Sequence, residues 1–197
     1  MDIGDGRKKP EKKSKKGSKG KKEGKFRWAF QIFLISVILS AVLTFASNNA
    51  LESASLPVAF AVLAAFILLG ILFDIIGVAV TAASDKPFHS MAARKVPGAR
   101  EALGLIRKAS RVSSFCNDVV GDICGIISGS TAAVIVVRLQ EAFSLRSIAV
   151  SLAIAAVVSG LTIGGKAIGK TFAIEKSTMV LQLVGRVLHL FSGKKRR

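Results

Sequence analysis

Four long stretches of this chain are nearly free of charged side chains, and they decide what it can fold into. They cover residues 28–51, 56–83, 117–137 and 147–169. About 20 helical residues cross a hydrocarbon core of roughly 30 Å, so each stretch is long enough to span a bilayer. A segment in lipid must satisfy its own backbone, and these runs lack the alternation of barrel strands. The sequence therefore predicts an all-α integral membrane protein with about four transmembrane helices.

The basic residues are segregated from these stretches, and their distribution predicts the orientation. The chain has a net charge of +17 although 51% of its residues are hydrophobic. Lys and Arg number twelve in residues 1–27, none in 49–55, seven in 85–112, two in 138–146 and eight in 166–197. Because cytoplasmic loops carry the excess of Lys and Arg, the pattern predicts a multi-pass protein of the cell (plasma) membrane with both termini cytoplasmic.

The remaining segments divide the chain around a helical transmembrane domain of residues 27–193. Residues 1–26 are rich in Lys and poor in apolar side chains, which predicts a disordered cytoplasmic tail. Pro87 and Pro97 are expected to break the long cytoplasmic connection. Apolar periodicity predicts cytoplasmic amphipathic juxtamembrane helices over 98–112 and 178–191. Residues 194–197 form a basic C-terminal tail.

The Lys-rich tail points to partners that carry negative charge. A polybasic segment beside a membrane span binds anionic lipid headgroups, at about 1 kcal/mol per Lys near the surface. It can also contact another polyanion through phosphate charge, or serve only as a topology signal. No aromatic residue is interleaved with the lysines, so no sequence-specific nucleic acid partner is predicted. The lipid bilayer and its anionic lipids are the expected partners.

Charged side chains inside the apolar stretches are the first candidates for function. Asp74 lies in the second stretch, Asp118 and Asp122 open the third, and Lys166 lies in the fourth. A charge at the centre of a membrane helix costs roughly 2.5–3.5 kcal/mol on translocon scales, so such residues usually have a partner. Lys166 is expected either to pair with an Asp or to snorkel to the interface.

Oxygen-bearing residues near these charges predict a site for a divalent cation. Magnesium takes hard oxygen ligands and keeps several waters. The candidate ligands are Asp74, Asn117, Asp118, Asp122 and Ser114. Lys166 works against a cation, because an ammonium beside a carboxylate fills the site with the protein's own charge. The predicted bound or transported ion is Mg²⁺, and no other cofactor is expected.

Glycines at spacing four mark a packing face on the third stretch. Gly121, Gly125 and Gly129 lie on one side of a helix, where they let another backbone approach closely. The approaching helix can belong to the same chain or to a second copy, and the sequence leaves both open. The chain shows no nucleophile elbow and no phosphate-binding glycine loop, so an enzyme is not expected.

Three short motifs carry a resemblance to a transporter family. They read FDIIGVAVTAAS from Phe73, VPGAREALGLIRKASRVSSFCNDVVGD from Val96, and GGKAIGKTFAIEKSTMVLQLVGRVL from Gly164. On these motifs, residues 66–191 resemble the transmembrane domain of the CorB/CorC-type (cyclin M-like) magnesium transporters. The resemblance implies three helices per protomer, a cytoplasmic belt of juxtamembrane helices, a homodimer and a cation site in the membrane. The helix over 28–51 would then be an addition.

The chain departs from this family at the positions that matter most for transport. The family's Ser-Gly-x-Glu motif aligns with residues 74–77, so its Glu is missing. The acid of the last motif is Lys166 here, and its Pro is Gly169. Asn117 keeps one Asn of the second motif, whereas the later Asn falls on Gly121. The regulatory CBS pair that commonly follows in the family is not expected here.

The function predicted from the sequence is therefore transport of a divalent, magnesium-type cation, or a degenerate relative of such a transporter. The alternative is a non-transporting membrane scaffold that docks to anionic lipid or partner proteins through its Lys-rich tail. A third option is a proton-coupled carrier built on an Asp–Lys pair, because buried lysines shift their pKa readily.

Overall fold

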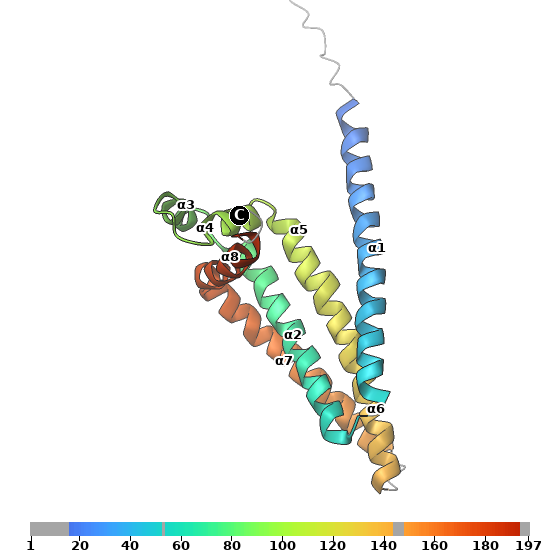
Figure 1. Cartoon of the computed structure of the whole chain (residues 1–197). Helices are drawn as coiled ribbons and strands as arrows, with labels where there is room; N and C mark the ends of the chain where they lie inside the picture. Colours follow the sequence, from blue (N-terminus) through green and yellow to red (C-terminus); the bar gives the residue numbers. More distant parts are fainter. Residues whose placement is uncertain (1–15, 53, 144–147, 194–197) are drawn as a thin grey trace, which may run out of the picture. The chain divides into compact units, whose positions relative to one another are not determined.

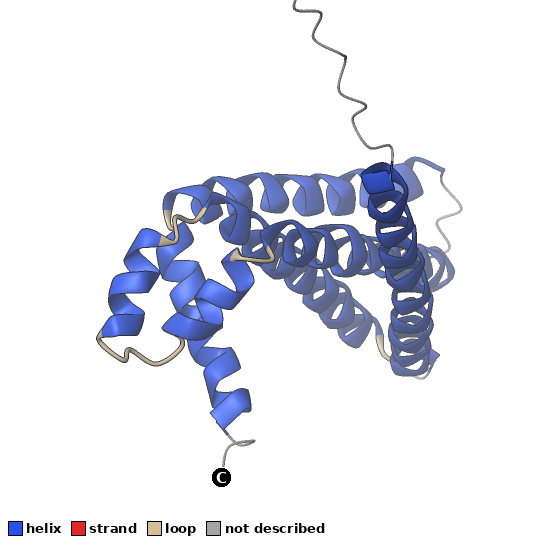
Figure 2. Ribbon diagram, turned by 90° about the horizontal axis from the view of Figure 1, so that it is seen from above, coloured by secondary structure: helices blue, strands red, loops and turns tan. Residues whose placement is uncertain are grey.

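The computed structural model describes residues 16–52, 54–143 and 148–193, and in these ranges every regular element is a helix. The chain forms two units, residues 1–35 and residues 36–197. In the first unit the described part is the beginning of one long helix, α1 (Lys16–Glu52), whose last turns belong to the second unit. Figure 1 shows the helices in chain order, and Figure 2 shows the same helices from above, joined by short loops.

Long helices α2, α6 and α7 form the body of the second unit. They are α2 (Leu56–Ala82), α6 (Asp122–Phe143) and α7 (Ile148–Glu175). Before α6 come α5 (Ala109–Ser114) and η1, a π-helix over Phe115–Gly121, which continue into it. Helix α2 packs against both α6 and α7 (Figure 1). Three short helices, α3 (Lys86–Ala93), α4 (Ala99–Ile106) and α8 (Ser177–Gly193), adjoin the ends of α2 and α7.

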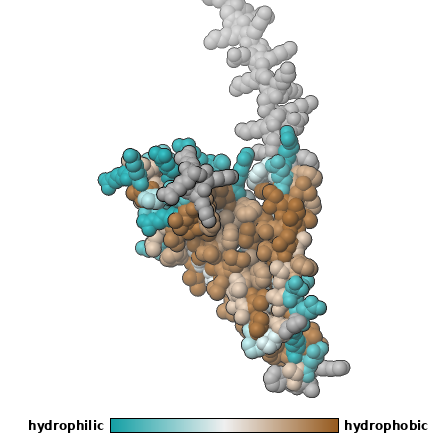
Figure 3. All heavy atoms as spheres, viewed as in Figure 1, coloured by the Kyte–Doolittle hydropathy of each residue, from teal (hydrophilic) through white to brown (hydrophobic). Residues whose placement is uncertain are grey.

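Four helical segments are long and apolar enough to cross a membrane. They are Arg27–Glu52, Leu56–Ala82, Ala109–Ala142 and Ile148–Glu175. Figure 3 shows apolar side chains over the long helices of the second unit and hydrophilic side chains gathered at the α3–α4 end. Exposed side chains such as Leu152, Ile163 and Ile168, each 65–75% accessible, would be very costly in water. The predicted all-α chain with four helices long and apolar enough to span a membrane is confirmed.

Two apolar clusters hold the second unit together, one toward each end of the long helices. One joins Leu51, Ala59, Leu63, Ala132 and Ile135. The other joins the end of α2 to the short helices through Ala79, Val80, Phe88, Ala102, Leu103, Ala173 and Leu181. At the first end the guanidinium of Arg138 donates to the backbone carbonyls of Leu51 and Ala54. The Leu51 carbonyl, in the last turn of α1, also accepts from the Ala54 N–H, and Ala54 lies just beyond the helix. Arg138 therefore ties α6 to the connection between α1 and α2.

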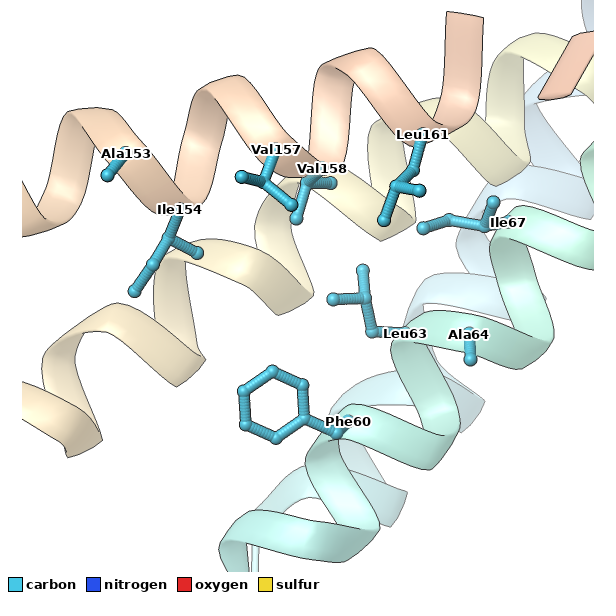
Figure 4. A pocket seen from close by; sticks show the side chains of 9 residues that line it. All are labelled: Phe60, Leu63, Ala64, Ile67, Ala153, Ile154, Val157, Val158 and Leu161. Carbon is cyan, nitrogen blue, oxygen red and sulfur yellow. The ribbon is translucent and has the colours of Figure 1, made fainter. Parts of the chain in front are cut away.

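An open apolar groove lies between α2 and α7 near the Leu51 end, with a volume of about 360 Å³. Figure 4 shows its lining, which is Phe60, Leu63, Ala64, Ile67, Ala153, Ile154, Val157, Val158 and Leu161. None of these side chains carries a polar atom, so the groove offers no ligand for an ion.

The prediction of one continuous helix over residues 98–112 is wrong. The structure has α4 and α5 in its place, separated at Arg107 and Lys108. The two helices pack on different partners, α4 on α8 and α5 on α2. One straight helix could not make both contacts. Helix α5 instead joins the membrane segment, which begins at Ala109 rather than at the predicted residue 117. The helix predicted over 178–191 is found as α8.

The expected effects of Pro87 and of the Lys-rich tail also differ from the structure. Pro87 lies in the first turn of α3, where its missing N–H costs nothing, so it begins a helix there. Residues 16–26, predicted to be disordered, belong to α1. Lysine is a good helix former, and a helix that is already nucleated extends at little cost. The rest of the predicted tail, residues 1–15, and the basic end at 194–197 lie outside the described residues.

Candidate functional site: a buried aspartate between two lysines

Asp74 occupies the middle of the α2–α6–α7 packing, between the two apolar clusters. Its side chain is only 4% exposed. A Cβ added at Gly121 would lie 3.1 Å from Asp74 Oδ1, so η1 reaches Asp74 only because residue 121 has no side chain. Gly77 faces the Asn117 side chain in the same way, one turn further along α2. Glycines on both helices thus let α2 and η1 approach closely around the carboxylate.

Two lysines of α7 point their ammonium groups at this carboxylate. Lys166 Nζ lies 3.8 Å from Asp74 Oδ1, and Lys170 Nζ lies 3.9 Å from Asp74 Oδ2. The Lys166 side chain is 23% exposed and that of Lys170 is 54% exposed, so Lys166 is the more enclosed of the pair. Gly165 and Gly169 bring α7 against Ile71 and Ile75 of α2, which sets both lysines over Asp74.

Lys166 was expected either to pair with an Asp or to snorkel to the interface, and in the structure it pairs with Asp74. The sequence reasoning missed Lys170, although a signal was present. Residues four apart on a helix share a face, so a lysine four positions after Lys166 reaches the same carboxylate. Asp74 thus faces two positive charges rather than one, and this small cluster carries a net positive charge.

The other predicted cation ligands do not join Asp74 in one cluster. Asp118 and Asp122 are exposed, because the opposite face of η1 and α6, with Val119, Ile123 and Cys124, packs inward. Ser114 is half-buried and lies at the end of α5. Among the described residues, no group of three His, Cys, Asp or Glu side chains can hold a metal ion. The expected set of three carboxylates is therefore wrong as a single site.

Asn117 is the predicted ligand that does face α2, at Gly77, one turn along that helix from Asp74. Its Nδ2 donates to Ser113 Oγ at 3.3 Å. Its Oδ1 is buried and accepts no hydrogen bond, an uncommon state that costs about 1–3 kcal/mol. The π-helical turn that carries Asn117 is a rare element, frequent at functional sites. An amide oxygen without a donor and a buried carboxylate one turn away along α2 are both hard oxygen atoms of the kind that magnesium prefers.

The three glycines predicted to form one packing face behave differently from one another. Gly121 packs against Asp74 as described, whereas a Cβ at Gly125 or at Gly129 would meet nothing within 4 Å. Intramolecular packing thus accounts for Gly121 alone. The predicted homodimer seam over Gly125 and Gly129 stays a prediction.

A second polar pair, which the sequence did not reveal, joins the two short helices α4 and α8. His189 Nδ1 lies 2.8 Å from Glu101 Oε1. This hydrogen bond is the main cause that lowers the pKa of the Glu101 carboxyl below its ordinary value. The two residues are 88 positions apart, so no local pattern could have paired them.

Replacing Glu101 by glutamine is expected to weaken the acid sensitivity of the fold. A carboxyl whose folded-state pKa is lowered stabilises the fold above its ordinary pKa, and this contribution is lost as the pH falls through the lowered value. The thermal midpoint of the parent should therefore fall more between neutral and acidic pH than that of Glu101→Gln. Glu175→Gln, at an exposed position at the end of α7, is the matched control. Parallel curves for parent and Glu101→Gln would contradict the role of this pair.

Comparisons with known proteins give no match: no family model, no curated protein and no solved structure matches this chain.

Proposed function

We propose that this chain is a membrane protein built on the plan of a divalent-cation transporter, in which two of its own lysines take the place of the cation. It is thus a non-conducting relative that acts as a scaffold at the membrane. The main support is the buried Asp74 carboxylate, whose oxygens lie 3.8 and 3.9 Å from the ammonium nitrogens of Lys166 and Lys170. The resemblance to the CorB/CorC-type family supports the plan, and the lysines support the loss of conduction.

Electrostatics explains why the lysines oppose a cation. Two unit charges 4 Å apart interact by about 4 kcal/mol at an effective dielectric of 20, and a divalent ion doubles this term. A magnesium ion at Asp74 would meet two ammonium groups and only one carboxylate. Repulsion therefore outweighs attraction as long as both lysines stay at Asp74. The unsatisfied Asn117 Oδ1 is consistent with a cation site that has lost its ion but kept one ligand.

The membrane setting of the proposal follows the charge pattern. The proposed orientation places both termini and the layer of α3, α4 and α8 in the cytoplasm at the plasma membrane, because these segments hold most of the Lys and Arg. The Lys-rich segment before α1 then faces anionic lipid headgroups, which attract it at about 1 kcal/mol per Lys. Docking on lipid or on a partner protein, rather than catalysis, is the proposed activity.

Replacing Lys166 by glutamate is expected to create magnesium binding. The change removes one repelling ammonium and adds a second carboxylate beside Asp74, so magnesium affinity should rise at least tenfold over the parent. Calorimetric titration of the purified chain in micelles measures this. Lys176→Glu, which makes the same charge change at an exposed position at the junction of α7 and α8, is the matched control and should gain nothing. Equal magnesium affinity in the parent and in Lys166→Glu would refute the proposed site.

A further inference from the structure

A hollow of about 410 Å³ lies in the layer of short helices, outside the membrane segments and separate from the Asp74 cluster. The turn between α3 and α4 lines it together with the start of α4 and one residue of α8. Its lining consists of Ala92, Lys95, Val96, Pro97, Gly98, Arg100, Glu101 and His189. Two of these side chains are always cationic near neutral pH, and one is acidic.

Lys95 has a backbone conformation that lysine rarely adopts. Its φ is +56°, and it is the one non-glycine residue with positive φ in the described chain. It follows the end of α3 in a Schellman motif, where Val96 N–H donates to Met91 O and Lys95 N–H to Ala92 O. Glycine is the usual residue at this position, because a side chain with a Cβ is unfavourable at positive φ. A lysine kept here at the expense of stability points to a function for its side chain.

Two glycines bring the opposite wall of the hollow into place. Gly98 has φ +85°, and a Cβ there would collide with the backbone of Gly185 and Arg186. A Cβ at Gly185 would likewise collide with the Gly98 carbonyl. This backbone crossing of α4 and α8 sets Glu101 against His189, one turn further along each helix. The close crossing of α4 and α8 thus forms one side of the hollow, and the α3–α4 turn forms the other.

The charges around the hollow favour an anion. Glu101 accepts a hydrogen bond from its own backbone N–H and shares another with His189, so its negative charge is already engaged. Neither Lys95 nor Arg100 makes an ion pair with another described residue, although the charge of Arg100 also acts on the Glu101 carboxylate. Counting Lys95, Arg100 and Glu101, the lining has a net charge of +1 with neutral His189, and +2 when His189 is protonated. A guanidinium and an ammonium on one hollow match the several acceptor oxygens of a phosphate group.

We propose that this hollow binds a phosphate group through Lys95 and Arg100. The hydrogen bond from His189 keeps the Glu101 carboxylate engaged, so that it does not oppose the phosphate. The phosphate belongs either to a lipid headgroup or to a soluble molecule. The headgroup source fits the place of the hollow, beside the ends of two membrane segments, where anionic headgroups lie. This inference does not depend on whether the Asp74 cluster conducts.

Lys95→Gly is the decisive variant, because a structural and a functional role of Lys95 predict opposite results for it. Glycine relieves the positive φ, so the thermal midpoint should rise, whereas phosphate affinity should fall about tenfold or more through loss of a charge-assisted contact. The full chain is reconstituted in phosphatidylcholine nanodiscs and titrated with inorganic phosphate and with glycerol 3-phosphate. In a second arm, binding is followed as phosphatidic acid replaces part of the phosphatidylcholine.

Three further variants complete the test. Arg100→Gln should lose phosphate affinity, and the double control Lys86→Gln/Lys176→Gln, at exposed positions outside the hollow, should keep it. Glu101→Gln should bind phosphate more tightly, since it removes the acid from the lining. Response to the soluble probes or to the lipid alone supports the site and identifies the source. No phosphate binding in either arm, undiminished affinity in Lys95→Gly, or weaker binding in Glu101→Gln would overturn the proposal.

Discussion

Gly185→Ala should lose about 3 kcal/mol of stability, because its new methyl group would collide with the Gly98 carbonyl. The methyl group would meet a backbone atom, so no side chain can rotate away to make room. Separation of α8 from α4 would also expose Ala102 and Leu181, which are fully buried in the parent. Denaturant unfolding of the reconstituted chain, followed by circular dichroism, measures the loss.

Gly104→Ala is the matched control for this prediction. Gly104 lies inside α4, and a Cβ there meets nothing within 4 Å. Alanine is the better helix former by about 1 kcal/mol, so this variant should be slightly more stable than the parent. If Gly185→Ala unfolds at the same denaturant concentration as the parent, then α4 and α8 do not cross as closely as described.

The second large effect is expected when both lysines over Asp74 become methionine. Methionine preserves the apolar length of the side chain and removes its charge. The double variant Lys166→Met/Lys170→Met then leaves a carboxylate of 4% exposure without a partner. Breaking a buried ion pair from one side costs about 3–5 kcal/mol, because the remaining charge stays desolvated. Thermal unfolding in the same lipid should show this loss.

Adding Asp74→Asn to the double variant is expected to restore most of the stability, since no buried charge then remains. Lys170→Met alone should have a smaller effect than Lys166→Met alone, because the Lys170 side chain is 54% exposed and partly solvated. If the triple variant is no more stable than the double, the loss comes from altered packing of α7 and not from the carboxylate.

The long helices could be predicted from the sequence because lipid leaves an apolar segment only one regular choice. The observed segments Arg27–Glu52 and Leu56–Ala82 agree with the predicted 28–51 and 56–83 to within a residue. The third segment was underestimated, because Arg111 and the serines after it interrupt the apolar run while the helix continues through α5 and η1. Hydropathy detects the apolar part of a helix and does not reveal a polar extension of the same helix.

The candidate site was predictable only in part. Asp74 and Lys166 were identified by the cost of a charge in an apolar stretch, and they do lie together. Asp118 and Asp122 were grouped with them because all three are acids in apolar surroundings. Whether an acid points inward depends on the rotation of its helix, and the packing that fixes this rotation involves contacts distant in sequence, such as those at Gly77 and Gly121. The same limit concealed the pairing of Glu101 with His189.

In the proposed function, the Asp74 carboxylate is paired with the protein's own lysines and does not bind a transported cation. The most direct test is magnesium flux into proteoliposomes, read by an enclosed fluorescent indicator, with Asp74→Ala measured beside the parent. We expect no magnesium flux above that of empty liposomes for the folded parent protein, and no difference in flux for Asp74→Ala. Magnesium flux through the parent that disappears in Asp74→Ala would contradict the account and identify the chain as a working transporter.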